Sequence, residues 1–197
     1  MIIYYTENYA GGRDESRRLL KRAISGHTGD PCRAEQLLSG LRTGEYGKPY
    51  IEGFDHFSVS HTGSVWAVLF DTRECGLDIQ FSKDCDFAAI ARRLNVPEDA
   101  AVITGVTEYE TADPKSAFFR LWTRREALAK AMGVSVYDSQ LTSVSTDELS
   151  IGSKTYRLTD ICFPQGLSAD GEKLHAAVCT ETVSAGENSI SIQITTL

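Results

Sequence analysis

The chain carries the stretch FFRLWTRREALAKAMG at residues 118–133, which predicts one long helix. Asp113 is a residue type that caps helix N-termini, and Pro114 suits the first helical position. Gly133 is a residue type at which helices end. Between these signals apolar residues recur at the spacing of one buried helix face: Phe118, Leu121, Trp122, Leu128, Ala129 and Met132.

Three charged residues stand on or beside this predicted buried face. Arg125 falls in the middle of the apolar positions, and Glu126 and Lys130 flank them one turn apart. For an isolated helix, the simplest interpretation is a solvated Glu126–Lys130 pair, with Arg125 extended to water. The alternative is a helix packed around an ionic site, because charges set against a buried face need partners.

An aspartate stands in the middle of an upstream strand. The segment CGLDIQ at residues 75–80 alternates apolar Leu77 and Ile79 with polar Asp78 and Gln80. An edge strand that shows its polar face to water would explain this pattern. Because aspartate is depleted within strands, the pattern also suggests that Asp78 reaches a hard cation together with a carboxylate from the helix.

Hydroxyl groups and an imidazole mark a third element. Tyr46-Gly47-Lys48-Pro49 precedes the segment FSVSHTG at residues 57–63, and the apolar run Val65–Phe70 follows it. The pattern predicts strand, turn and strand, with Ser60, His61 and Thr62 where the chain reverses. A plain hairpin turn would account for it, although such groups at a strand end also suit phosphate oxygens.

These three elements, in this order, resemble the motifs of the 4'-phosphopantetheinyl transferase superfamily. The family has Gly-Lys-Pro with Asn-x-Ser-His, then Gly-(Ile/Val)-Asp-(Ile/Val)-Glu, then Trp-(Ser/Thr)-x-Lys-Glu-(Ser/Ala)-x-x-Lys. This chain has Gly47-Lys48-Pro49 with Ser58-Val59-Ser60-His61, then Gly76-Leu77-Asp78-Ile79-Gln80, then the segment WTRREALAK at residues 122–130. The resemblance extends from about Arg13 to the end of the chain and is closest to the surfactin-synthetase-activating type, which has two halves in one chain.

The resemblance implies an α+β fold in which two similar halves, 1–96 and 97–197, meet in a pseudo-twofold arrangement around one active site. It implies transfer of 4'-phosphopantetheine from coenzyme A to a serine of an apo acyl or peptidyl carrier protein, with release of 3',5'-ADP. The enzyme would be a magnesium-dependent transferase of the holo-[acyl-carrier-protein] synthase type, serving fatty acid, polyketide or nonribosomal peptide biosynthesis.

The same resemblance implies roles for individual residues. Glu126 and Lys130 are the expected catalytic residues, with Glu126 or a metal-bound hydroxide as the base. The expected magnesium ligands are Asp78, Gln80 and Glu126. The residues expected to hold coenzyme A are Arg13, Lys48, Ser60, His61, Thr62 and Lys130. Arg17 is the alternative to Arg13 for the 3'-phosphate.

Three positions depart from the family pattern. Ser58 replaces asparagine, Arg125 replaces lysine, and Gln80 replaces a metal-binding glutamate. Because magnesium needs only one or two carboxylates besides substrate phosphates, Asp78 and Glu126 could suffice, with Gln80 holding a coordinated water. The alternative is a coenzyme A-binding protein of the same fold that has lost transfer activity. A structural α+β protein whose helix merely carries ion pairs is a third interpretation.

The composition is that of a single globular protein. The chain has 197 residues and a net charge of −7, which argues against a nucleic-acid-binding protein. The first residues lack a basic leader, and the apolar run Val65–Phe70 is too short to cross a bilayer, so we expect a cytoplasmic protein without membrane contact. Five cysteines without CxxC spacing predict reduced thiols. We expect a monomer.

Further elements follow from periodicity and turn residues. A basic amphipathic helix is expected from Arg13 to Ile24, ending near Gly26, and another helix from Asp86 to Leu94. Strands are expected near Lys154–Phe163, Leu174–Thr180 and Ser189–Thr196. Two basic surfaces are candidates for docking an acidic carrier protein: Arg17, Arg18, Lys21 and Arg22 on the first helix, and Arg120 with Arg124 on the long helix.

Overall fold

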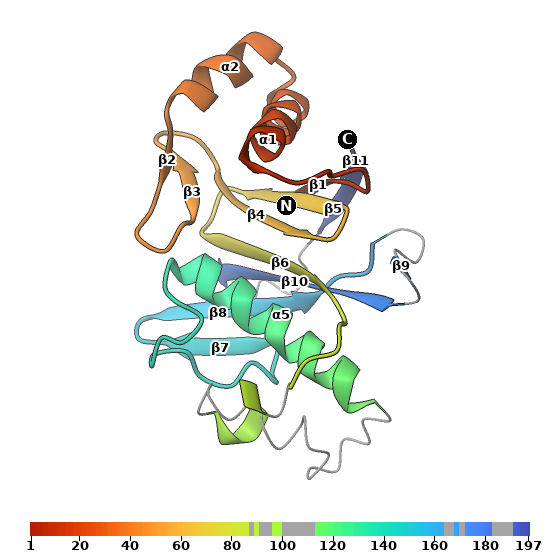
Figure 1. The fold of residues 1–197 in the computed structure, drawn as a ribbon. Coiled ribbons are helices and arrows are strands. Elements are labelled where there is room, and N and C mark those ends of the chain that lie inside the picture. Colours follow the sequence, from red (N-terminus) through yellow and green to blue (C-terminus); the bar gives the residue numbers. More distant parts are fainter. Residues whose placement is uncertain (87–88, 91–95, 100–112, 164–167, 170–171, 183–190) are drawn as a thin grey trace.

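A computed structural model describes residues 1–86, 89–90, 96–99, 113–163, 168–169, 172–182 and 191–197 of the chain. Figure 1 shows two larger sheets, each covered by a long helix, and residues 41–43 and 49–51 form a third sheet of two strands. The helices are α1 (Arg13–Thr28), α2 (Pro31–Ser39) and α5 (Pro114–Met132). The strands are β1 (Ile2–Thr6), β2 (Leu41–Thr43), β3 (Pro49–Ile51), β4 (His56–Thr62), β5 (Val65–Asp71), β6 (Cys75–Phe81), β7 (Glu148–Ile151), β8 (Lys154–Asp160), β9 (Ser168–Ala169), β10 (Glu172–Thr182) and β11 (Gln193–Thr196).

The first sheet has the strand order β11-β1-β5-β4. A tight turn joins β4 to β5, and Gly63 in this turn has φ 52, a value that favours glycine. The apolar face of α1, which includes Leu20 and Ile24, packs on Trp66 and Phe70 of β5. The indole Nε1 of Trp66 also donates a hydrogen bond to Ser16 Oγ on α1 at 2.9 Å. The helix is therefore fixed to the sheet by both apolar and polar contacts.

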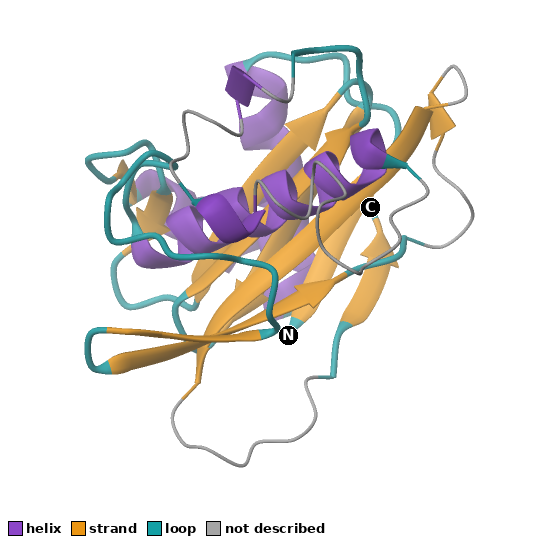
Figure 2. Ribbon diagram, turned by 90° about the horizontal axis from the view of Figure 1, so that it is seen from below, coloured by secondary structure: helices purple, strands orange, loops and turns teal. Residues whose placement is uncertain are grey.

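The second sheet has the order β6-β10-β8-β7, and β9 pairs with the first residues of β10. Figure 2 shows α5 lying across this sheet. The helix begins as predicted, with the side chain of Asp113 accepting from the amide of Lys115, and it ends at Gly133 in the left-handed conformation. Its buried face packs on residues of β8 and β10 that include Leu158, Ala177 and Cys179.

The faces of the two sheets that point away from α1 and α5 share one core. Alternate residues of β1 and β5, such as Ile3 and Leu69, pack with alternate residues of β6 and β10, such as Ile79 and Val178. This shared core places β4, the edge of the first sheet, beside β6, the edge of the second. The expected α+β fold is confirmed, and the division into 1–96 and 97–197 stays a prediction.

Several local expectations were inexact. The first helix continues past Gly26 to Thr28, because the left-handed residue that ends it is Gly29. Gly26 lies within the helix, where a Cβ would come 3.2 Å from the ring of Tyr4. Helix α2 and strands β2, β3 and β7 were not predicted. Most of the helix expected over 86–94 lies outside the described residues. The cysteines are unbonded, and no described helix has the length and apolar character needed to cross a bilayer.

Candidate active site

A glycine on β6 lets the long helix approach the strand backbone. A Cβ on Gly76 would overlap the carbonyl oxygen of Ala127 and lie 2.6 Å from the amide nitrogen of Ala131. Only a residue without a side chain fits beneath these two turns of α5. The close contact places Glu126 and Lys130, on neighbouring turns, over Asp78, which lies two residues beyond Gly76 on the same face of β6.

Asp78 and Lys130 form an ion pair in the interior. Lys130 Nζ lies 2.7 Å from Asp78 Oδ1, and only 6% of Asp78 is exposed to solvent. The ammonium also donates hydrogen bonds to the carbonyl oxygen of Leu77 at 3.0 Å and to Ser60 Oγ at 3.3 Å. Three oxygen atoms from two strands therefore hold the ammonium group of Lys130. The solvated Glu126–Lys130 surface pair considered in the sequence analysis is thus not formed.

Glu126 is the second carboxylate of the site. Burial, followed by repulsion from Asp78, raises the pKa of Glu126, and the nearby Lys130 lowers it by less. The charge of Asp78 therefore acts on Glu126, which is itself half-buried. A divalent cation would relieve this repulsion, and carboxylate oxygens are the ligands that magnesium prefers.

Gln80 follows Asp78 on the same face of β6, one alternation further along the strand. Among the described residues, its amide nitrogen donates one long hydrogen bond, 3.4 Å, to the carbonyl oxygen of Phe81. In the described part of the chain, no three histidine, cysteine or acidic side chains gather as a metal-binding group. The structure thus brings Asp78 and Glu126 together, and Gln80 lies next to them without a third negative charge.

Three hydroxyl groups of β4 join it to β6. Ser58 Oγ accepts a hydrogen bond from the Leu77 amide at 3.0 Å, Ser60 Oγ from Ile79 at 3.2 Å, and Thr62 Oγ1 from Phe81 at 3.2 Å. We call these three contacts the hydroxyl seam. Because side chains alternate along a strand, every second residue of β4 points into the seam. The predicted site residues Ser60 and Thr62 are therefore buried.

His61, between them, is exposed. Its ring lies 5.1 Å from the ring of Tyr9, and the Tyr9 hydroxyl donates a hydrogen bond to the Gly12 carbonyl at 3.1 Å. These contacts place His61 near the beginning of α1, where Arg13 is also exposed. Arg17, the alternative to Arg13, donates a hydrogen bond to the Leu38 carbonyl at 2.9 Å and so ties α1 to α2.

Lys48 lies on the other side of the site. Its ammonium is 2.8 Å from Glu74 Oε2, and its side chain is mostly buried. A pocket of about 110 Å³ is lined by both Lys48 and Lys130. A second pocket, of about 610 Å³, lies between the β2–β3 hairpin and the end of α5, and Lys48 lines this pocket as well. Of the predicted residues, Lys48 and Lys130 therefore line one pocket, whereas Arg13 and His61 lie near the beginning of α1.

A family model described as the 4'-phosphopantetheinyl transferase superfamily matches residues 74–181, which span β6, α5 and most of β10. The chain belongs to this superfamily. The match covers more than half of the sequence and includes the cluster of Asp78, Glu126 and Lys130. The family match and the structure therefore both favour the alternative interpretation of this helix, as a helix packed around an ionic site.

Individual relatives agree with the family model. The chain is 30% identical over 181 residues to the 4'-phosphopantetheinyl transferase AcpT of Escherichia coli, covering 87% of this chain and 78% of the relative. It is 31% identical over 158 residues to AcpT of Salmonella typhi, covering 76% and 71%. A Haemophilus influenzae relative is 33% identical over 107 residues, covering 51% and 43%. The chain thus spans less than half the length of some transferases that it matches.

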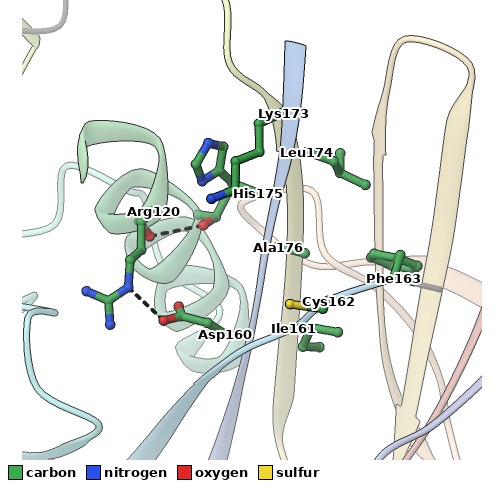
Figure 3. A pocket seen from close by; sticks show the side chains of 10 residues that line it. Arg120, Asp160, Ile161, Cys162, Phe163, Lys173, Leu174, His175 and Ala176 are labelled. Atoms are coloured by element: carbon green, nitrogen blue, oxygen red, sulfur yellow. Dashed lines mark hydrogen bonds and ion pairs between the residues drawn. The ribbon is translucent and has the colours of Figure 1, made fainter. Parts of the chain in front are cut away.

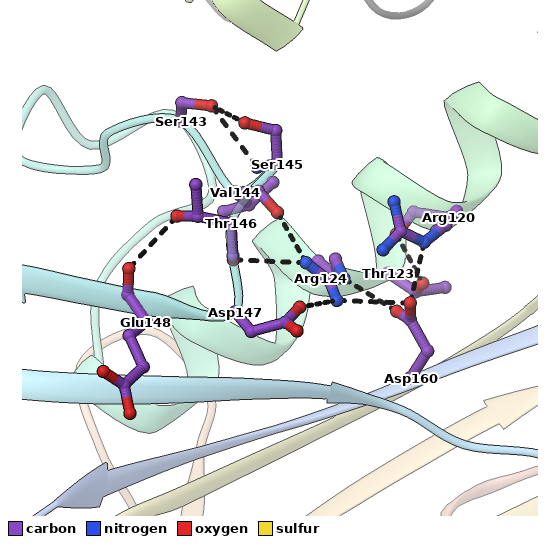
Figure 4. Close-up of polar contacts among 10 residues, drawn as sticks. All are labelled: Arg120, Thr123, Arg124, Ser143, Val144, Ser145, Thr146, Asp147, Glu148 and Asp160. Carbon is purple, nitrogen blue, oxygen red and sulfur yellow. Dashed lines mark hydrogen bonds and ion pairs between the residues drawn. The ribbon is translucent and has the colours of Figure 1, made fainter. Parts of the chain in front are cut away.

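The two arginines before Glu126 have structural partners that the sequence does not reveal. Arg124 is buried, and Figure 4 shows its guanidinium between Asp147 and Asp160, to which it donates hydrogen bonds at 2.6 Å and 2.7 Å. It also donates to the carbonyl oxygens of Val144 and Thr146 at 3.0 Å and 3.2 Å. The expectation that Arg124 belongs to an exposed docking surface is wrong, because these partners withdraw it from solvent.

Arg125 is buried as well and does not extend to water. Its Nε donates a hydrogen bond to the Val136 carbonyl at 2.9 Å, in the segment that follows α5. The buried carboxylate of Asp99 lies near enough to act on the charge of Arg125, although burial lowers the pKa of this arginine overall. Arg124 and Arg125 therefore anchor the residues after α5, while Glu126 and Lys130 face β6.

A separate pocket of about 430 Å³ lies on the side of α5 that faces β8 (Figure 3). Arg120 lines it and donates a hydrogen bond to Asp160 at 2.7 Å, with Lys173 and His175 contributed by β10. Burial, with a smaller contribution from Lys173, lowers the pKa of His175 to about 4, and its ring stacks on Phe119. His175 is thus a neutral buried side chain, as expected for a structural residue.

Proposed function

We propose that this protein transfers the 4'-phosphopantetheine group of coenzyme A to a serine of an apo acyl or peptidyl carrier protein, releasing 3',5'-ADP. The observation that carries the proposal is the cluster of Asp78, Glu126 and Lys130, in which two carboxylates and one ammonium meet at the junction of the two sheets. Coenzyme A brings a pyrophosphate, and transfer of a phosphoryl group depends chiefly on positioning and charge neutralisation.

Magnesium fits the residues that this junction contains. Asp78 and Glu126 would hold the ion, with Gln80 near enough to orient a water, because magnesium usually keeps several waters and needs only one or two carboxylates. Burial and, after it, repulsion from Asp78 raise the pKa of Glu126, and a cation held between the two carboxylates would relieve that repulsion. When bound, the ion would compensate the negative charge of the pyrophosphate.

Glu126 is our candidate for the general base. In the reaction the serine oxygen of the carrier forms a bond to phosphorus, the bond from phosphorus to the 3',5'-ADP oxygen breaks, and the serine proton moves to Glu126. A carboxylate whose pKa is raised by burial holds this proton better than an exposed one. Lys130, held 2.7 Å from Asp78, would neutralise phosphate oxygens beside the reacting phosphorus.

The phosphates of the nucleotide need further positive charge. Exposed Arg13 and His61 lie toward the beginning of α1, and Lys48 borders the pockets beside Lys130. We assign the 3'-phosphate to Arg13 and His61 and the pyrophosphate to Lys48 and Lys130. Thr62 belongs to the same predicted set, although its oxygen already accepts the amide of Phe81, so its contribution would be the remaining hydroxyl proton.

The second candidate function is binding of coenzyme A without transfer, and one observation favours it. Gln80 supplies no charge where the family pattern has a glutamate, and no group of three or more histidine, cysteine or acidic side chains that could hold a metal is found in the described residues. A site with two carboxylates could then retain the nucleotide pocket while binding the cation too weakly for turnover.

Intact-mass spectrometry separates the two candidates. The protein is incubated with coenzyme A, magnesium and separate apo carrier proteins of the fatty acid, polyketide and nonribosomal peptide types. We expect at least one carrier to gain one phosphopantetheine group, and no gain when magnesium is replaced by a chelator. Coenzyme A binding measured by calorimetry, without any mass gain, would support the binding protein instead. Absence of both would refute the nucleotide site.

A further inference from the structure

Ser60 makes contacts that distinguish it from the other members of the hydroxyl seam. Its Oγ donates a hydrogen bond to Asp78 Oδ1 at 2.8 Å and accepts from the Ile79 amide at 3.2 Å. Lys130 Nζ approaches the same oxygen at 3.3 Å. A serine hydroxyl has one proton and two lone pairs, so these three contacts use its full capacity.

Ser58 and Thr62 provide the comparison within the same strand. Each accepts one hydrogen bond from a β6 amide, at 3.0 Å and 3.2 Å, and in the described part of the chain neither forms a hydrogen bond with a charged side chain. The amide contact therefore joins the strands at all three positions. The contact with a carboxylate is specific to Ser60.

The two oxygens of Asp78 are not equivalent. Ser60 and Lys130 both bind Oδ1, at 2.8 Å and 2.7 Å. Among the residues that the structure describes, none donates a hydrogen bond to Oδ2. Two donors on one oxygen fix the rotation of the carboxylate and leave the other oxygen with its lone pairs available.

We propose that Ser60 is a positioning residue that orients Asp78, so that Oδ2 is presented to the cation and Lys130 stays beside it. This inference rests on the proposed function, because it presumes the magnesium site at Asp78 and Glu126. It differs from the phosphate contact that the family resemblance implies for Ser60. Its oxygen is already saturated by groups of the protein, so a phosphate would have to displace one of them.

The direct test measures cation binding without any substrate. The variants S60A and S58A each remove one hydroxyl that accepts from a β6 amide, so they are matched for loss of seam contacts. Binding of Mn²⁺, a paramagnetic substitute for magnesium, is followed by electron paramagnetic resonance. Loss of a hydrogen bond that orients a metal ligand typically weakens affinity by about 10–100-fold. We expect a loss of that size for S60A and nearly unchanged Mn²⁺ affinity for S58A.

A second measurement separates the carboxylate role from a phosphate role. Turnover of the variant S60A is compared with coenzyme A and with 3'-dephospho-coenzyme A. We expect the same fold-loss of kcat with both, at saturating donor and fixed magnesium, because Ser60 acts through Asp78. Loss confined to the substrate with the 3'-phosphate, seen as a higher KM, would overturn the inference in favour of the phosphate contact.

The outcomes also distinguish this inference from the function on which it rests. Equal Mn²⁺ affinities of S60A and wild-type protein would overturn the positioning role and leave the proposed function standing. Wild-type protein that binds no Mn²⁺, either alone or together with coenzyme A, would overturn both the positioning role and the proposed cation site. Equal losses in S60A and S58A would show that the seam, and not the contact with Asp78, controls the site.

Discussion

Gly76 of β6 faces the main chain of Ala127 in α5 so closely that no side chain fits between them. The contact fixes the height of α5 above the sheet, and with it the distance from the helix carboxylate at Glu126 to the strand carboxylate at Asp78. A strand glycine normally weakens a sheet, because it contributes no side chain to packing. Here it is the residue that allows two charged positions, distant in sequence, to act as one site.

Replacing Gly76 by alanine should therefore force strand and helix apart. We expect the unfolding free energy of the variant Gly76→Ala to fall by about 1–3 kcal/mol, the usual cost of overpacking. We also expect the variant to lose its transfer activity. Urea denaturation provides the measurement. Gly40→Ala is the control, because a Cβ there would lie at an ordinary 3.4 Å from the Leu37 carbonyl. Similar stabilities of the two variants would contradict the close contact.

Glu126→Gln should abolish transfer yet stabilise the metal-free protein at neutral pH. Burial, then Asp78, raises the pKa of Glu126, so the fold favours its protonated form and its ionised form destabilises the fold above that pKa. The neutral amide removes this cost. Melting temperatures measured against pH should show an advantage for the variant that disappears below about pH 4, where the carboxyl is protonated in both states. An advantage independent of pH would contradict this electrostatic origin.

Gln80→Glu should be tolerated and should tighten magnesium binding. The change adds a third carboxylate on the face of β6 that carries Asp78, and more negative charge favours a divalent cation. Turnover measured against magnesium concentration should reach its half-maximum at a lower concentration than in wild-type protein. An unchanged magnesium dependence would place residue 80 outside the coordination sphere. Complete loss of activity would mean that the amide has a role of its own.

Arg124→Met should destabilise the fold by about 3 kcal/mol, because it leaves two carboxylates without their buried partner. This value is the lower end of the cost of breaking a buried ion pair, since Asp147 and Asp160 keep some contact with water. Arg120→Met is the matched control, since Arg120 is more exposed and shares Asp160 as partner; we expect less than about 1 kcal/mol. Unfolding free energies from denaturant titration compare the two.

The pH dependence gives Arg124 a second check. Burial raises the pKa of Asp160, but hydrogen bonds and charge from Arg124 outweigh it and leave the pKa lowered. A lowered carboxyl pKa stabilises the fold above the ordinary value, and this contribution is lost as the pH falls through the folded-state value. The difference between wild-type protein and the Arg124 variant should therefore shrink in acid. A constant difference would assign the loss to packing alone.

Arg13→Ala should weaken coenzyme A binding with little change in kcat, because a contact to the 3'-phosphate is the same in ground and transition states. The test is the dissociation constant for coenzyme A compared with that for 3'-dephospho-coenzyme A. We expect the variant to bind both equally, since it lacks the partner for the extra phosphate. If both ligands are weakened by the same factor, Arg13 serves another part of the nucleotide.

Local signals predicted the long helix and the paired charges well. Asp113, Pro114 and Gly133 set the ends of α5 because capping depends on residues next to one another in sequence. Asp78, Glu126 and Lys130 were expected to meet because the order of the motifs resembled a known family, and the structure brings them together. Periodicity alone would not have paired a strand with a helix almost fifty residues later.

Contacts between distant elements were beyond such signals. The alternating polar residues Ser58, Ser60 and Thr62 have the pattern of a strand with one face in water, yet their hydroxyls bind the amides of β6. The residue type of Arg124 predicts an exposed side chain, because charged residues are mostly on the surface. Its carboxylate partners follow more than twenty residues later, and no residue near Arg124 in the sequence predicts this pairing.

The parallel pairing of β11 with β1 has a consequence for the order in which the chain matures during synthesis. Residues 2–5 pair with residues 193–196, so one edge of β1 stays open until residues 193–196 have been made. An unpaired strand edge is a template for association with other chains. A ribosome-bound nascent chain that ends before residue 193 would therefore expose β1, and chaperones that recognise apolar strands should engage it until β11 emerges.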